Sequence, residues 1–255
     1  MAINPGDLLV VRYDTTLVAA SYLVSAMGSF FALECALRLR RKDGSLDWTM
    51  LAGAAIMLGG IGIWSMHFIG MQAYLLDVPI SYDGWLTVVS LAAAVAIAGL
   101  ALYLSGGTGK FNPRGWLVGS FIAALGVCLM HYIGMFAQIV RATMTLDWLV
   151  VAASFGIALA AALAALWLAF NVRTRALRVC AALVMGLAVC AMHYTGMSAA
   201  TLICTESTPA LPTWTFHSYN LAEWTFGIAM LWVFLMSIVL VIRIEAPPTV
   251  PTHRR

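Results

Sequence analysis

Charge is scarce in this sequence. Only 10% of its 255 residues are charged, whereas 62% are hydrophobic. A soluble domain carries about 25% charged residues, so this composition excludes an ordinary soluble protein and indicates a membrane protein. Lysine is scarcer still, because Lys42 and Lys110 are the only two and both lie between hydrophobic runs. A retinal protein needs a buried lysine for its Schiff base, so that class is excluded.

Leader and disulfide signals are also missing. No short basic segment with an Ala-x-Ala-like cleavage site precedes the first hydrophobic run, so no cleaved signal peptide is expected. The five cysteines lie mostly inside hydrophobic runs and give no disulfide framework. The net charge of +3 comes mainly from residues that flank these runs, and it gives no reason to expect a nucleic-acid partner.

Long hydrophobic runs are what the sequence has in abundance. A helix that spans a bilayer needs roughly 20 apolar residues. Seven runs qualify, at about 15–37, 49–75, 85–104, 116–138, 147–170, 177–202 and 221–242. Backbone groups in lipid must pair within their own segment, so the predicted fold class is all-α, a seven-transmembrane helical bundle in the lipid bilayer.

Basic residues predict the orientation of the bundle. Twelve of the fourteen follow or flank the ends of spans 1, 3, 5 and 7, and only Arg12 and Arg141 lie on the other side. Basic residues concentrate in cytoplasmic connections. The sequence therefore predicts that the N-terminus is outside and the C-terminus is cytoplasmic.

A six-residue motif occurs three times. It reads MHFIGM at 66–71, MHYIGM at 130–135 and MHYTGM at 192–197, near the predicted outer ends of spans 2, 4 and 6. Each odd span opens with an aspartate seven residues before a serine, at Asp14, Asp83 and Asp147. The repeat predicts three tandem two-helix units followed by a seventh helix.

The motif combines metal-binding residue types. Residues four apart share a helix face, so each motif presents an imidazole and a thioether together. The predicted metal ligands are His67, His131 and His193 with Met71, Met135 and Met197, and at the edge of each face Met66, Met130 and Met192. Thioether and imidazole ligands favour copper, above all Cu(I), while imidazole alone also suits zinc or haem iron.

Other residues near the motifs have simpler explanations. A methionine in a membrane helix is usually a packing residue, and a lone histidine is usually structural, but three histidines at one depth favour a ligand role. The aspartates Asp14, Asp83 and Asp147 are expected as helix N-caps. They are also candidate acceptors for the outer N–H of each histidine, in the second coordination shell. Cys128 and Cys190, one turn before their histidines, are further candidate ligands.

Together these features resemble the MHYT family of bacterial integral membrane sensor domains, over about residues 8–243. The resemblance implies a bacterial inner-membrane sensor that binds copper through the motif Met and His residues. Oxygen, carbon monoxide and nitric oxide are the implied signals. It further implies no enzyme activity in this domain but a cytoplasmic output domain, in cis or in trans. That domain is often a GGDEF or EAL domain acting on cyclic di-GMP, and sometimes a kinase. Such an output favours a homodimer. Phe68 departs from the tyrosine of the other two motifs, and Trp64 replaces their cysteine.

The predicted domain boundary lies after span 7. Residues 1–243 form the sensor, and residues 244–255 form a Pro-rich cytoplasmic linker that leads to an output domain outside this chain. Two alternatives stay open at this point. A copper transporter would use a second ligand layer near the midplane of the bilayer. A haem-binding membrane electron carrier or enzyme would hold iron between facing histidines.

Overall fold

The computed structural model describes residues 4–41, 43–106, 112–172, 174–207 and 209–245, and seven helices within this part are long and apolar enough to cross a membrane. They are α1 (Thr15–Ala36), a composite span of α2 (Trp48–Ala55), η1 (Ile56–Ser65) and α3 (Met66–Ala73), α4 (Gly84–Gly106), α5 (Pro113–Phe136), α6 (Trp148–Asn171), α7 (Arg175–Ser198) and α8 (Ser218–Glu245). The predicted all-α fold with seven spans is confirmed. The sixth predicted run was too long, because residues 200–204 form a strand.

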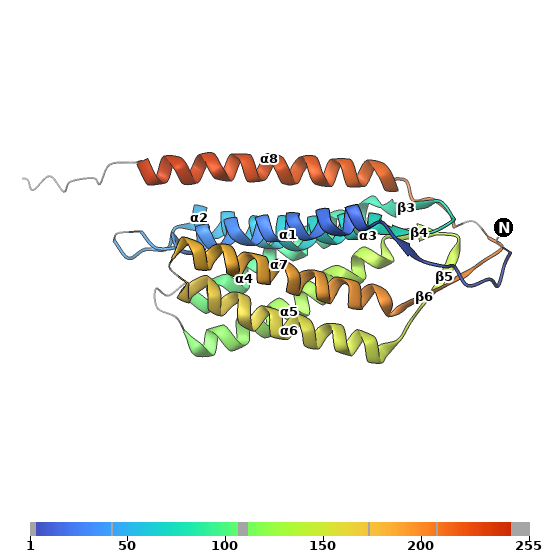
Figure 1. The fold of residues 1–255 in the computed structure, drawn as a ribbon, viewed down its shortest axis with the longest axis horizontal. Coiled ribbons are helices and arrows are strands. Elements are labelled where there is room, and N and C mark those ends of the chain that lie inside the picture. Colours follow the sequence, from blue (N-terminus) through green and yellow to red (C-terminus); the bar gives the residue numbers. More distant parts are fainter. Residues whose placement is uncertain (1–3, 42, 107–111, 173, 208, 246–255) are drawn as a thin grey trace, which may run out of the picture.

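The first six spans form a ring. Each packs on its neighbours in the order α1, η1, α4, α5, α6 and α7, and α7 closes the ring on α1. The last helix, α8, lies outside this ring and packs on α1 and α3 (Figure 1). Because three similar hairpins make up the ring, the same face of each even span points to the bundle axis. The predicted tail at 244–255 falls almost wholly outside the described residues.

Aspartates start several helices. The carboxylates of Asp14, Asp47 and Asp147 accept backbone N–H groups two and three residues ahead, at 2.8 to 3.3 Å. Asp83 accepts the N–H of Leu86 at 2.9 Å in the same way. A helix start leaves its first N–H groups without intrahelical partners, and a carboxylate satisfies them. The predicted N-cap role of Asp14, Asp83 and Asp147 is confirmed.

Short antiparallel strands cover one end of the ring, near the N-terminus (Figure 1). They are β1 (Arg12–Tyr13) with β2 (Tyr74–Leu75), β3 (Ile80–Asp83) between β4 (Gln138–Val140) and β7 (Thr215–His217), and β5 (Ala142–Leu146) with β6 (Ala200–Cys204). One backbone bond recurs in every hairpin, from the Asp N–H to the carbonyl six residues after the motif histidine: Asp14 to Ala73, Asp83 to Ala137 and Asp147 to Ala199, at 2.8 to 2.9 Å. These bonds close each hairpin at the same depth.

Ion pairs gather at the opposite end. The carboxylate of Glu34 on α1 pairs with Arg38 at 2.8 Å and with Arg178 of α7 at 2.7 Å. The buried carboxylate of Asp47, before α2, pairs with Arg243 of α8 at 3.1 Å. Glu34 and Arg38 are four residues apart and therefore share one helix face. The Asp47–Arg243 pair ties the last helix to the span that carries the first motif.

The composite second span contains a π-helix, η1, which the sequence reading did not predict. A π-helix is rare and leaves carbonyls poorly paired, so it needs outside support. The Ser25 hydroxyl donates to the carbonyl of Gly62 at 2.6 Å, and the Ser65 hydroxyl donates to that of Gly60 at 3.0 Å. A Cβ at Gly28 on α1 would fall under 3.0 Å from the backbone of Gly62, so glycine permits the close approach of these two spans.

Candidate metal centre

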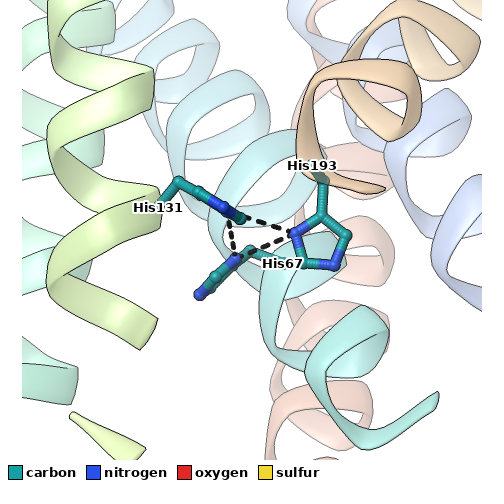
Figure 2. Close-up of side chains that lie close together, drawn as sticks. All are labelled: His67, His131 and His193. Atoms are coloured by element: carbon teal, nitrogen blue, oxygen red, sulfur yellow. Dashed lines mark hydrogen bonds between the residues drawn. The ribbon is translucent and has the colours of Figure 1, made fainter. Parts of the chain in front are cut away.

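The three motif histidines meet on the axis of the ring. His67 comes from α3, His131 from α5 and His193 from α7, and all three side chains are buried. Their Nδ1 atoms point at one another, 3.1, 3.1 and 3.3 Å apart (Figure 2). The rings stand nearly at right angles, with interplanar angles of 77 to 89°. We refer to these three residues as the histidine triad.

The triad has the dimensions of a metal site. Three nitrogen ligands at roughly 2.0 Å around a tetrahedral metal lie about 3.3 Å apart. The observed Nδ1 separations of 3.1 to 3.3 Å agree with this value. These three Nδ1 atoms are the ones that would hold the metal. Three ring nitrogens aimed at one centre also repel each other unless a proton or a cation lies between them.

The outer nitrogens of the triad face glycines of the neighbouring motif. A Cβ at Gly134 would fall under 3.0 Å from Nε2 of His67, and Gly196 and Gly70 stand in the same relation to the other two imidazoles. The motif glycine therefore leaves room for the next imidazole around the ring. Among the described residues no Nε2 of the triad has a hydrogen-bond partner.

The expectation that the aspartates accept the outer histidine N–H was therefore wrong. The described oxygen contacts of Asp14, Asp83 and Asp147 are the backbone N–H groups at the starts of their helices. Cys128 and Cys190 also lie outside the cluster, because His67, His131 and His193 are the only members of the group of His, Cys, Asp and Glu side chains that the described residues bring together. Among the described residues, the cluster consists of imidazole side chains alone.

A second set of contacts passes from each repeat to the next. The Tyr194 hydroxyl lies 3.0 Å from Ser21 Oγ, and the Tyr132 hydroxyl lies 3.0 Å from Ser154 Oγ. These serines are the ones that follow the odd-span aspartates by seven residues. The sequence reading aligned them but did not predict their partners.

The first motif makes the same contact by another route. Phe68 has no hydroxyl, but the indole N–H of Trp64, one turn earlier, donates to the hydroxyl of Ser90 at 2.9 Å. Ser90 is the corresponding serine of the second repeat. The two departures from the motif therefore compensate each other, because Trp64 supplies the donor that Phe68 lacks.

The motif methionines are all buried. Their exposed fractions are 0 to 1%. Four of them, Met71, Met130, Met135 and Met197, pack in one apolar cluster with Trp64, Phe68 and Tyr82. Met192 packs instead against alanines of α5 and α6. The structure therefore buries all six motif thioethers, and the role of any methionine as a ligand stays a prediction.

Fold and site together define the class: a multi-pass membrane protein in which three hairpin repeats build one buried histidine cluster. The chain belongs to the MHYT family of bacterial signalling proteins, whose model, described as a bacterial signalling protein N-terminal repeat, matches residues 60–119 and 125–182. It is a multi-pass protein of the bacterial inner membrane. No solved structure matches it.

Curated relatives are signalling proteins. The chain is 39% identical over 198 residues to the bifunctional diguanylate cyclase/cyclic di-GMP phosphodiesterase MucR of Pseudomonas aeruginosa. This match covers 76% of this chain and 29% of MucR. It is 31% identical to the signalling protein YkoW of Bacillus subtilis over 75% of this chain and 24% of YkoW. It is 32% identical to the cyclic di-GMP phosphodiesterase NbdA of Pseudomonas aeruginosa over 81% of this chain and 27% of NbdA. The chain thus spans less than a third of the length of each.

Proposed function

We propose that this chain is the sensory part of a membrane signalling protein. In this proposal the histidine triad binds copper, and a change at the metal is relayed to a cytoplasmic output domain that makes or breaks cyclic di-GMP. The chain itself has no catalytic role. The observation that carries the proposal is the convergence of three Nδ1 atoms at tetrahedral spacing on the axis of the bundle. The activities named for MucR and NbdA support this type of output.

The donor set favours Cu(I) over divalent metals. Imidazole binds copper and zinc well, and methionine-rich surroundings favour Cu(I). No carboxylate or cysteine joins the histidines in the described cluster, so a bound metal would keep its full charge inside the bilayer. The cost of burying an ion rises with the square of its charge, so a monovalent ion is the least costly occupant. Bound copper would supply a redox-active centre.

The chain offers a route from the site to its C-terminus. Signalling requires two arrangements of the helices that a ligand stabilises to different extents. α8 packs on α3, which carries His67, and the Arg243–Asp47 ion pair holds the other end of α8 to the same span. A shift of the second span would therefore act on α8 at both ends. We propose oxygen, nitric oxide or carbon monoxide as the signal, and a homodimer as the signalling unit.

Two alternatives receive less support. A transporter needs a polar path across the membrane, but the side chains one and two turns below the triad are apolar. A haem iron with two axial histidines places the macrocycle between their rings. The triad imidazoles have ring centroids only 4.9 to 5.2 Å apart, which leaves no such gap. The apolar layers below the triad and the close spacing of the imidazoles both agree with a sensor.

A chimaera tests the proposed function. This chain would replace the matching region of MucR, and cyclic di-GMP turnover would be measured in membrane vesicles with copper supplied or chelated, and with nitric oxide added. We expect turnover to change with these treatments and to become insensitive to them when all three triad histidines are replaced by alanine. If the unmodified chimaera binds copper but its cyclic di-GMP turnover is unchanged by every treatment, the sensor role is contradicted.

A further inference from the structure

An apolar chamber lies inside the ring next to the triad. Its volume is about 60 Å³, and its walls come from η1, α4, α5, α6 and α7. The side chains that line it are all aliphatic or methionine, apart from one glycine. Half of the lining residues are alanines, so the chamber exists because side chains at these positions are small.

The chamber begins one turn from the imidazoles. Its lining includes Ile63, Val127 and Val189. Each of these residues stands four positions before a triad histidine and therefore shares that histidine's helix face. The chamber therefore lies on the N-terminal side of the triad layer along each of these three helices. A molecule in contact with Ile63, Val127 and Val189 would lie about one helical turn, roughly 5.4 Å, from the triad layer.

The lining determines what the chamber can hold. A buried water needs two to four polar partners, and these side chains offer none. In another protein an apolar cavity of about 150 Å³ stays dry and holds benzene or xenon. A chamber of about 60 Å³ is too small for an aromatic ring or an acyl chain, but it is large enough for a diatomic molecule or a xenon atom. Because its walls belong to membrane spans, nonpolar gases dissolved in the bilayer surround it.

We propose that this chamber is a binding site for a small nonpolar molecule of diatomic size, taken up from the membrane and held about one helical turn from the histidine triad. The chamber would concentrate the molecule beside the site and keep water away from it. Binding in the chamber does not depend on the metal, but its use in sensing rests on the proposed function.

Crystals of the full chain under xenon pressure test this inference. We expect anomalous density for xenon between Ile63, Val127 and Val189. Ala162→Leu places a larger side chain in the chamber and should abolish this density. The matched control is Ala164→Leu, at an exposed position on the same helix, which should keep it. Val189→Ala enlarges the chamber and should keep or raise the xenon occupancy.

Two results would overturn the inference: no xenon in the chamber of the unmodified protein, or xenon that persists in Ala162→Leu. If Ala162→Leu does not fold, the xenon occupancies of the unmodified protein and of Val189→Ala still decide whether the chamber binds the gas. Metal content measured on the same preparations separates the two proposals. Xenon bound without copper would contradict the proposed function alone, and copper bound without xenon would contradict this inference alone.

Discussion

At the scale of single residues, the motif is explained by contacts between neighbouring repeats. The histidine supplies Nδ1 to the centre, the glycine makes room for the next imidazole, and the tyrosine or its substitute bonds to a serine of another repeat. The sequence predicted three candidate ligand histidines at one depth, because the three repeats share one register, and the structure brings them together. It did not predict which ring nitrogen points inward, because that depends on which repeat lies beside which.

Gly134→Ala should disrupt the triad. The new methyl group would overlap the imidazole of His67, so we expect metal content to fall about as far as in His67→Ala. The matched control is Gly156→Ala on α6, where an added Cβ meets nothing within 4 Å. That change should leave metal content unaltered and favour the helix slightly. Equal metal content in the two alanine variants, measured by elemental analysis, would show that the motif glycine does not position the histidine.

The pair Trp64 and Phe68 should behave as one unit. Trp64→Cys alone removes the donor to Ser90 and leaves a cavity, which costs about 3 kcal/mol or more. Phe68→Tyr alone adds a hydroxyl to a full core and costs about 1–3 kcal/mol. The double variant restores the pattern of the other motifs, so its loss of stability should be smaller than the sum by about 0.5–3 kcal/mol. Unfolding in detergent measures each term, and strict additivity would refute the compensation.

At the scale of elements, the sequence predicted the seven spans well because hydrophobic length is a local property. It missed the π-helix because its carbonyls are partly satisfied by Ser25 of another span and because Gly28 and Gly62 permit the close approach. It missed the strands because they are two to five residues long and because the strand before a hairpin pairs with the strand after it, far along the chain, or in one case with the strand before α8. Tertiary contacts decide both features, and a single segment of sequence carries little sign of them.

The ion pair between α8 and the second span predicts a pH dependence. Burial raises the pKa of the Asp47 carboxyl, but the N–H of Met50, the side chain of Arg41 and the charge of Arg243 together hold it below its ordinary value of 3.8. A carboxyl with a lowered pKa contributes stability above its unfolded-state pKa, and this contribution is lost as the pH falls through the folded-state pKa.

Asp47→Asn should therefore be less stable than the unmodified protein at neutral pH, and the difference should close as the pH falls below 3.8. Asparagine keeps the N-cap, so only the charge is removed. Asp77→Asn is the control, because the pair of Asp77 with Arg12 is well exposed and should contribute little. Unfolding midpoints across the acid range give the answer. A stability difference that is the same at every pH would rule out the carboxylate as its cause.

At the scale of the whole molecule, charge defines two ends. Seven of the nine described basic residues lie at the end opposite the strands: Arg38, Arg40, Arg41, Arg114, Arg175, Arg178 and Arg243. The predicted orientation places this end in the cytoplasm, so that α8 leads there and the triad lies toward the periplasm. The packing of the three repeats around the triad needs no particular orientation, but signalling to a cytoplasmic output does.

Labelling in intact cells tests the orientation. In a background with Cys180→Ser, an Asp43→Cys variant should resist a membrane-impermeant thiol reagent, because Asp43 lies at the basic end. Leu211→Cys, exposed at the strand end, should react. Reaction of Asp43→Cys from outside, with Leu211→Cys protected, would reverse the topology and contradict a cytoplasmic output reached through α8.

The central claim is that the histidine triad is one metal site, and metal content tests it most directly. The protein would be purified from copper-supplied cells and analysed for metal per chain. We predict about one copper per chain in the unmodified protein, and a sharp loss in each of His67→Ala, His131→Ala and His193→Ala, because all three Nδ1 atoms share one centre. His217→Ala, a histidine of strand β7 outside the triad, and Met57→Leu should keep the metal. Copper that survives the removal of all three triad histidines, or a correctly folded unmodified protein that binds none, would contradict the account.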